Sequence, residues 1–229
     1  MKRIGLLVTV VLAAALLPGC MGTMLYETAR TTPPGKAQFG GSLTPVHIVA
    51  TGDGIGGTFI PLPDLFVKLG VAPGFDLGAR WAFGPGITVN GKAQFMRGKV
   101  DGAFHLAGNF TGIFVGGGGF GAATLAPRVI LSSEPPGGFP FAANAGLSYT
   151  GVFAGGDGET ASGGTLGAVA GFGLPFRLGA KKTLVLQPEV GVGIPILAGA
   201  SYSGETEFIE ALNALSINAG INFGYAPTR

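Results

Sequence analysis

Residues 75–83 read Phe-Asp-Leu-Gly-Ala-Arg-Trp-Ala-Phe and alternate in character without interruption. Asp76 and Arg80 fall on one side, and large apolar side chains, including Trp81 and Phe83, fall on the other. A period of two indicates a β-strand. A soluble sheet buries its apolar face against a second layer, whereas a transmembrane barrel turns that face toward lipid. Recurrence of the pattern along the chain therefore decides the fold.

The same alternation recurs from residue 36 to residue 226, for example in residues 87–96 and 184–196. We count about ten such segments, with eight or twelve as alternatives, and their lengths suit the roughly 9 to 11 residues that a tilted strand needs to cross a bilayer. No long amphipathic helix is available to cover a sheet, although residues 207–212 suit one or two helical turns. The pattern predicts an all-β fold, an antiparallel up-and-down transmembrane β-barrel.

The composition fits a folded chain of which only part of the surface contacts water. Hydrophobic residues make up 47% of the chain and charged residues 11%, whereas soluble domains carry about 25% charged residues. The 44 Gly and 16 Pro residues approach the content of low-complexity chains, but 17 Phe residues argue against disorder,. The sequence therefore favours a folded chain with little charged surface.

The N-terminus has the layout of a secretory signal peptide over residues 1–19. Basic Lys2 and Arg3 precede an apolar run, which ends in Leu-Pro-Gly-Cys at residues 17–20,. This ending resembles the lipobox of bacterial lipoproteins, which implies acylation of Cys20; the alternative is a stray Cys after an ordinary signal peptide. Cys20 is the single Cys of the chain, so an intramolecular disulfide is excluded,. We expect residues 20–35 to form a lipidated tether and residues 36–226 to form the barrel.

Removal of the signal peptide also removes two positive charges. The remaining chain has 12 basic and 12 acidic residues, because Lys2 and Arg3 account for two of the 14 bases. A neutral chain without basic clusters lacks the electrostatic footprint of a nucleic-acid-binding protein. We therefore expect no nucleic-acid partner.

Seven charged side chains fall on the same strand face as the Gly, Ser, Thr and Asn residues, so a barrel would place them in its lumen. Five are bases and two are acids, an excess of about three positive charges by this count. We favour ion pairs that plug a narrow barrel over an open pore that prefers a small anionic solute. The predicted lumen charges are Lys68, Asp76, Arg80, Lys92, Arg128, Arg177 and Glu189.

Aromatic side chains recur on the opposite strand face. A barrel turns this face to the hydrocarbon and places aromatic girdles at the membrane interfaces. The predicted lipid-facing aromatics are Trp81, Phe83, Phe95, Phe110, Phe172, Phe176, Phe223 and Tyr225.

No catalytic or metal-binding motif stands out. His47 and His105 are the two imidazoles of the chain, and neither belongs to a metal-ligand spacing,. We expect no metal, no cofactor and no enzymatic activity. Two alternatives stay open: a soluble β-sandwich surface lipoprotein that binds a ligand or partner, and, with less support, a barrel hydrolase that uses His105 as a base.

An even strand count would return the C-terminus to the side of the N-terminus, as bacterial outer-membrane barrels require. On this assignment the periplasmic connections are short, and longer outward connections lie near residues 51, 155 and 198. Short periplasmic turns and longer extracellular loops are typical of these barrels.

The chain resembles small Gram-negative outer-membrane β-barrel proteins, in particular those of lipoprotein type. The resemblance rests on Cys20, on hairpins such as residues 68–80, and on a last strand that ends in Phe223 and Tyr225. It implies a bacterial outer-membrane location, an N-terminus anchored by lipid at the periplasmic face, and recognition of the last strand by the barrel assembly machinery. Membrane lipid would be the main partner, and the resemblance names no extracellular partner.

Overall fold

The computed structural model describes residues 25–51, 54–82, 86–115, 118–135, 138–156, 159–202, 205–209 and 214–227. These residues form twelve strands and no α-helix. Within the same residues, no helix is long and apolar enough to cross a membrane. Cys20 and Phe83 lie outside the described residues, so the structure does not test the predictions made for them.

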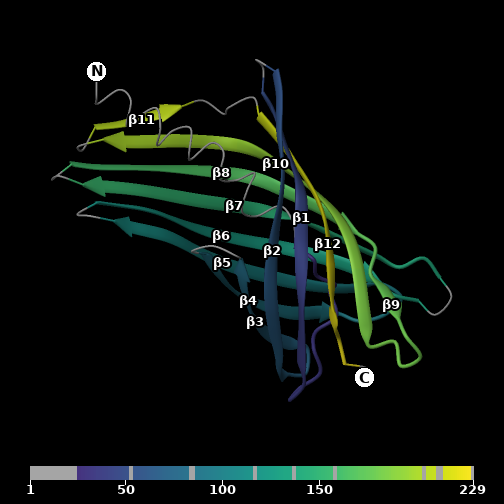
Figure 1. The fold of residues 1–229 in the computed structure, drawn as a ribbon. Coiled ribbons are helices and arrows are strands. Elements are labelled where there is room, and N and C mark those ends of the chain that lie inside the picture. Colours follow the sequence, from purple (N-terminus) through teal and green to yellow (C-terminus); the bar gives the residue numbers. More distant parts are fainter. Residues whose placement is uncertain are drawn as a thin grey trace.

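The twelve strands join into one antiparallel sheet whose two ends meet (Figure 1). The chain runs from β1 to β8 as neighbouring hairpins, β8 then pairs with β10, β10 pairs with β12, and β12 closes the ring by pairing with β1. The strands are β1 (Ala37–Thr51), β2 (Gly54–Ala72), β3 (Phe75–Ala82), β4 (Gly86–Met96), β5 (Asp101–Val115), β6 (Gly118–Ser133), β7 (Phe141–Gly156), β8 (Glu159–Gly173), β9 (Phe176–Leu178), β10 (Leu184–Tyr202), β11 (Glu205–Ile209) and β12 (Ala214–Tyr225).

Ten strand positions make up the wall of the barrel. Short β9 pairs with the start of β10 beyond the end of β8, so β8 and β9 share one position. In the same way, β11 pairs with the end of β10 and β12 with its start. The predicted antiparallel barrel of about ten strands is confirmed. The β-sandwich alternative is wrong, because a sandwich needs two packed sheets and this chain closes a single sheet.

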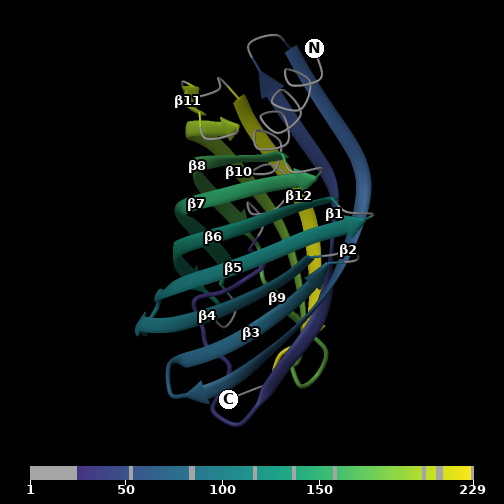
Figure 2. The same ribbon diagram turned by 90° about the vertical axis from the view of Figure 1, so that its left-hand side faces the viewer.

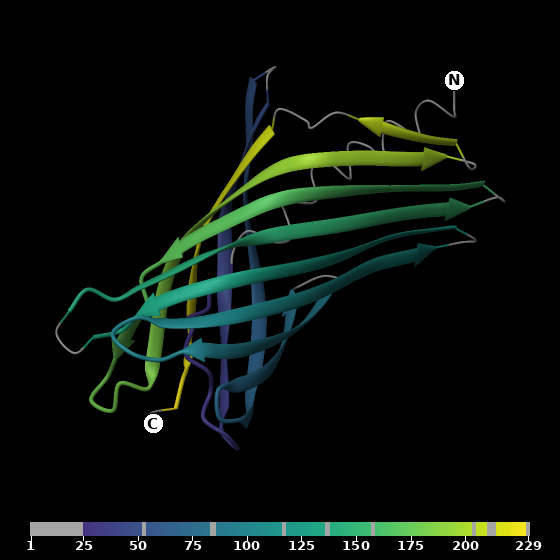
Figure 3. The same ribbon diagram turned by 180° about the vertical axis from the view of Figure 1, so that it is seen from behind.

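The strands are longer than the sequence pattern predicted. Residues near 51, 155 and 198, expected in long outward connections, belong to strands, and Thr51 pairs with Gly54 across a two-residue connection. Of residues 207–212, expected to form helical turns, 207–209 belong to β11 and 210–212 lie outside the described residues. Seen from behind, the long strands β5 to β8 reach well beyond the short strands β3 and β4 (Figure 3). In β7 and β8, small residues such as Gly155, Gly156 and Ser162 continue the backbone ladder beyond the length that lipid requires,.

The outer face of the wall is apolar, and the inner face is polar. Outward side chains such as Leu77, Val89 and Leu106 are about half exposed, whereas inward Asp76 and Thr165 are fully buried. Outward aromatic rings also pack across strands, as Phe39 does with Tyr225. The structure places these predicted lipid-facing aromatics on the outer face: Trp81, Phe95, Phe110, Phe172, Phe176, Phe223 and Tyr225.

The lumen is occupied by the chain itself. Residues 25–34, which we call the lumen segment, run inside the ring of strands before β1 begins, and Figure 2 shows this part of the chain in purple within the wall. The sequence predicts a tether over residues 20–35, but the described part of that stretch is largely buried inside the barrel. The reason lies in long-range contacts with the wall.

Candidate functional site

The lumen segment enters the barrel from the end at which β1 begins and β12 ends, which we call the base. Pro33 and Pro34 favour an extended backbone, and Gly35 adopts a φ of 71° where the chain turns into β1. The Gly35 N–H donates to the Gly70 carbonyl at 2.9 Å, and the Gly70 N–H donates to the Lys36 carbonyl at 3.0 Å. These bonds fix the segment to β2 at the base.

Wall side chains accept hydrogen bonds from the backbone of the lumen segment. The two carboxylate oxygens of Glu189 accept the N–H groups of Leu25 and Tyr26, at 2.7 Å and 2.6 Å. The Ser132 hydroxyl accepts the Ala29 N–H at 2.9 Å, and the Asp76 carboxylate accepts the Thr32 N–H at 2.8 Å. An extended chain outside a sheet needs such partners, because a buried N–H without one is costly.

Glu27 is the centre of the charged contacts. Its carboxylate lies 3.0 Å from the Lys68 ammonium and 2.8 Å from the Lys92 ammonium, with all three side chains at most 3% exposed. Burial alone would raise the pKa of Glu27, but the two lysines outweigh it and hold that pKa below its usual range,. Glu27 is therefore a charged counter-ion that the lumen segment brings to two wall lysines.

A row of ionisable side chains lies beside Glu27. Asp76 of β3 pairs with Lys92 of β4, Lys92 pairs with His105 of β5, and His105 pairs with Arg128 of β6. Lys92 is 3.5 Å from the Asp76 carboxylate, and His105 Nε2 is 3.7 Å from the Glu27 carboxylate. The alternation predicts that Asp76, Lys92 and Arg128 share one strand face, and the structure brings them together at one level of the lumen.

Tyr26 packs against the wall in a way that requires a glycine. Its hydroxyl lies 3.0 Å from the Thr44 hydroxyl, and its ring lies 5.5 Å from the Arg80 guanidinium,. A Cβ at Gly220 would lie 2.0 Å from the Tyr26 hydroxyl. The inward glycine of β12 therefore leaves the space in which the ring sits.

A small apolar contact completes the seat of the segment. Leu25 and Ala29 pack with Ala103 and Ile130 of the wall, and all four side chains are buried. Small Ala103 and Ala29 allow the segment to approach the β5 and β6 strands closely. The segment is thus held by backbone bonds, ion pairs and apolar contacts together.

The remaining predicted charges also have partners. Glu189 accepts the backbone N–H groups of Leu25 and Tyr26, as described. Arg80 donates to the Leu25 carbonyl at 3.1 Å and lies 3.6 Å from the Asp64 carboxylate. Arg128 donates to the Asn144 side chain at 3.0 Å. Arg177 pairs with Glu134 at the base, away from the row around Glu27.

The excess of positive charge counted from the sequence disappears in the folded lumen. The seven predicted charges and five further side chains, namely Glu27, Asp64, Asp101, Glu134 and Arg30, form a cluster around Glu27 and several separate ion pairs and hydrogen bonds. Together the twelve side chains are six bases and six carboxylates, so their summed formal charge is zero. The bases are Arg30, Lys68, Arg80, Lys92, Arg128 and Arg177, and the carboxylates are Glu27, Asp64, Asp76, Asp101, Glu134 and Glu189.

Sequence reasoning missed these additional partners for different reasons. Asp64 shares the parity of Lys68 on β2, so alternation is consistent with its inward face, but the sequence did not single it out. Asp101 begins β5 and Glu134 follows the end of β6, where the alternating pattern ends. Glu27 and Arg30 lie in a stretch without periodicity, where no local signal indicates which residues they contact.

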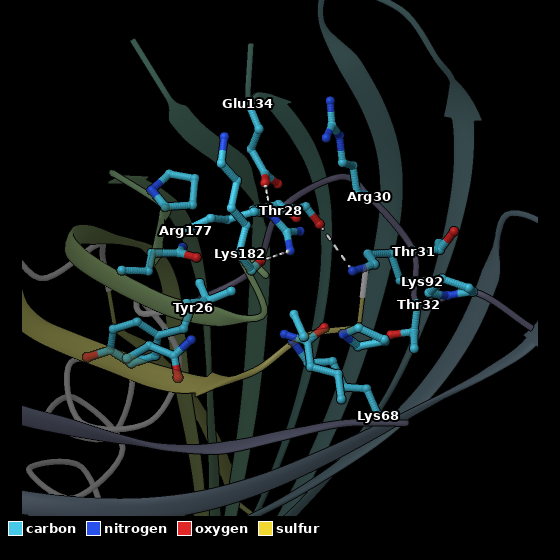
Figure 4. A pocket seen from close by; sticks show the side chains of 18 residues that line it. Tyr26, Thr28, Arg30, Thr31, Thr32, Lys68, Lys92, Glu134, Arg177 and Lys182 are labelled. Atoms are coloured by element: carbon cyan, nitrogen blue, oxygen red, sulfur yellow. Dashed lines mark hydrogen bonds and ion pairs between the residues drawn. The ribbon is translucent and has the colours of Figure 1, made fainter. Parts of the chain in front are cut away.

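A cavity of about 270 Å³ separates the lumen segment from one side of the wall at the base, and we call it the mouth cavity (Figure 4). Lys68 and Lys92 border it next to the segment, and Arg177 and Lys182 border it on the other side. No group of three or more His, Cys, Asp or Glu residues suited to a metal ion occurs within the described residues. The polar lining of the cavity suits a polar molecule.

No protein-family model and no curated protein sequence matches the chain. Solved structures of outer-membrane proteins are similar in fold. The outer membrane protease OmpT from Escherichia coli is 6% identical, with a TM-score of 0.49 over 83% of this chain and 95% of that chain. The translocator domain of autotransporter NalP from Neisseria meningitidis is 12% identical, with a TM-score of 0.45 over 98% of each chain. Outer membrane protein AlkL is 9% identical, with a TM-score of 0.41 over 91% of this chain and 98% of that chain.

Proposed function

We propose that this protein is an outer-membrane β-barrel lipoprotein whose pore is closed by its own lumen segment. In the closed state its role is structural, and when the segment leaves it becomes a narrow, porin-like pore. The observation that carries the proposal is the position of Glu27. This buried carboxylate of the lumen segment forms ion pairs with Lys68 and Lys92 of the wall. Breaking such buried pairs is costly, so the closed state is favoured.

The outer surface supports a membrane location. Large apolar side chains stand about half exposed over the whole wall, among them Leu69, Val89 and Ile194. A water-soluble protein rarely exposes so large a contiguous apolar surface. Lipid covers this surface without cost, and the pairing of β12 with β1 closes the ring, so that no strand of the ring is left as an open edge along its whole length,.

After the lumen segment leaves, the open pore would conduct anions in preference to cations. Removal of the segment takes Glu27 away from both lysines, so that Lys92 keeps the Asp76 carboxylate and Lys68 loses its ion-pair partner. A ring with an excess of bases at a narrow point favours anions. A small anionic solute is therefore the transported partner that this proposal implies.

The outer-membrane assignment brings further expectations as part of the proposal. Cys20 carries the lipid that holds the N-terminus at the periplasmic face, and Phe223 and Tyr225 end the strand that the barrel assembly machinery reads. Tyr225 closes β12 at the base, next to β1. The proposal includes no nucleic-acid partner and leaves the extracellular partner unnamed.

The proposed role is not enzymatic. His105 is 3% exposed and lies under Glu27 of the lumen segment, so a substrate would reach it only after the segment had moved. The rival hypothesis of a barrel hydrolase predicts that His105→Ala abolishes hydrolysis of lipid or peptide substrates. Activity that survives this substitution excludes His105 as the general base.

Single-channel conductance in a planar bilayer tests the proposed function. We expect the refolded full chain to be silent, and a variant that lacks residues 25–34 to give small steps whose reversal potential in a salt gradient indicates anion preference. A matched variant, Glu134→Gln, breaks an ion pair at the base without touching the segment and should stay silent. Equal conductance of the full chain and the deletion variant would contradict the proposal.

A further inference from the structure

The mouth cavity has the size and enclosure of a small-molecule site. Its volume of about 270 Å³ is close to the lower end of the range for ligand pockets, roughly 300 Å³. The lumen segment forms one wall, and β1, β10 and β12 form the opposite wall (Figure 4). The cavity opens toward the base, beside the turn that contains Lys182.

The charges around the cavity are arranged asymmetrically. Five bases and one acid line it: Arg30, Lys68, Lys92, Arg177, Lys182 and Glu134. The carboxylates that neutralise three of these bases, namely Glu27, Asp76 and Asp101, are not part of the lining. Each of these ion pairs therefore has its positive end toward the cavity, and the local field favours an anion.

Three buried side-chain oxygens in the lining have no hydrogen-bond partner within the described part of the chain. One is Oε1 of Glu134, whose other carboxylate oxygen pairs with Arg177. The other two are the Thr32 hydroxyl and the Asn222 side-chain oxygen, on residues that are 4% and 2% exposed. Thr32 belongs to the lumen segment and Asn222 to β12, so the two groups come from opposite sides of the cavity. Buried polar groups are usually hydrogen-bonded, and two that line the same cavity point to a polar occupant.

We propose that the mouth cavity binds a small organic anion that also carries hydroxyl groups. The positive charges of Lys182, Arg30, Lys68 and Lys92 attract its carboxylate or phosphate group. Thr32 donates to one of its oxygens, and the Asn222 oxygen accepts from one of its hydroxyls. This site exists only while the lumen segment is seated, and it does not depend on conduction through the barrel.

Isothermal titration calorimetry of the refolded full chain with citrate, a hydroxylated tricarboxylate, tests the proposal. Lys182→Met should weaken citrate binding at least tenfold, because Lys182 lines the cavity. The adjacent Lys181→Met is the matched control, since Lys181 is exposed and lies outside the lining, and it should leave the affinity unchanged. Thr32→Val should also weaken binding.

Three results overturn the proposal. Equal losses in the Lys182 and Lys181 variants mean that citrate responds to overall surface charge. Binding of the neutral polyol erythritol as tightly as citrate removes the role of the anion, and binding of sulfate as tightly as citrate removes the role of the hydroxyl. Conductance measured on the same preparations keeps a failure of the site distinct from a failure of the pore proposal.

Discussion

Glu27→Gln should release the lumen segment from the barrel. The substitution keeps the size of the side chain but leaves Lys68 buried without another carboxylate in ion-pair distance among the described residues, while Lys92 keeps Asp76. Removing one partner of a buried ion pair costs about 3–5 kcal/mol. Since about 1.4 kcal/mol is a tenfold change, the unseated population should rise by roughly two to three and a half orders of magnitude.

Thiol labelling measures this population. Ala29 is fully buried under the wall, so a Cys at this position reacts with a bulky maleimide only when the segment leaves. In a Cys20→Ser background, Ala29→Cys should react slowly in the parent chain and at least a hundredfold faster with Glu27→Gln. Glu134→Gln serves as the control, because it breaks a pair at the base that does not hold the segment.

A double variant separates charge pairing from general damage. Glu27→Gln with Lys68→Met removes both members of the pair, so no uncompensated charge stays buried, and most of the protection of the residue-29 thiol should return. Protection that is unchanged in Glu27→Gln, or a double variant that labels as fast as the single one, would falsify the central role of Glu27.

Three further predictions test the seat, the outer wall and the anchor. Gly70→Val should speed labelling of the residue-29 thiol at least tenfold, because a Cβ there would lie 2.1 Å from the Pro33 carbonyl oxygen; Gly56→Val, on the same strand with no atom within 4 Å of its Cβ, should not. Val89→Arg should lower the free energy of unfolding in liposomes by about 2–4 kcal/mol if the outward face lies at the bilayer midplane, and an unchanged value argues against lipid there. Cys20→Ser should abolish palmitate incorporation in cells, and retained label would place the acyl group elsewhere.

The outer wall was predictable from sequence because lipid imposes a simple rule on every strand. Each outward position must be apolar, and side chains alternate strictly, so residues such as Trp81 and Phe110 identify their face without knowledge of their neighbours. The number of strand positions follows from counting these segments. The ends of β7 and β8 were less predictable, because there the ladder continues through Gly, Ser and Thr residues that carry no apolar signal.

The lumen segment was not predictable in the same way. Its extended chain has no internal hydrogen-bond pattern, and its partners lie far away in sequence: Glu27 contacts Lys68 and Lys92, and Leu25 contacts Glu189. Local propensity describes such a stretch only as irregular. The seven inward charges did contain a hint, since five bases with two acids in a dry interior require further carboxylates nearby.

The inward glycines can now be explained without an open pore. The interior of a ten-stranded barrel is too wide to be filled by wall side chains of ordinary size. An empty polar lumen of this width would admit water or solute. At Gly70 a Cβ would meet the backbone of Thr32 and Pro33, and at Gly220 it would meet Tyr26. These glycines let the lumen segment approach the wall closely enough for its N–H groups and Glu27 to find their partners. These two glycines are therefore where the segment is held. A bulky side chain at Gly70 would meet the segment alone and should open the barrel, whereas one at Gly220 would also meet the β1 backbone at Leu43 and Thr44.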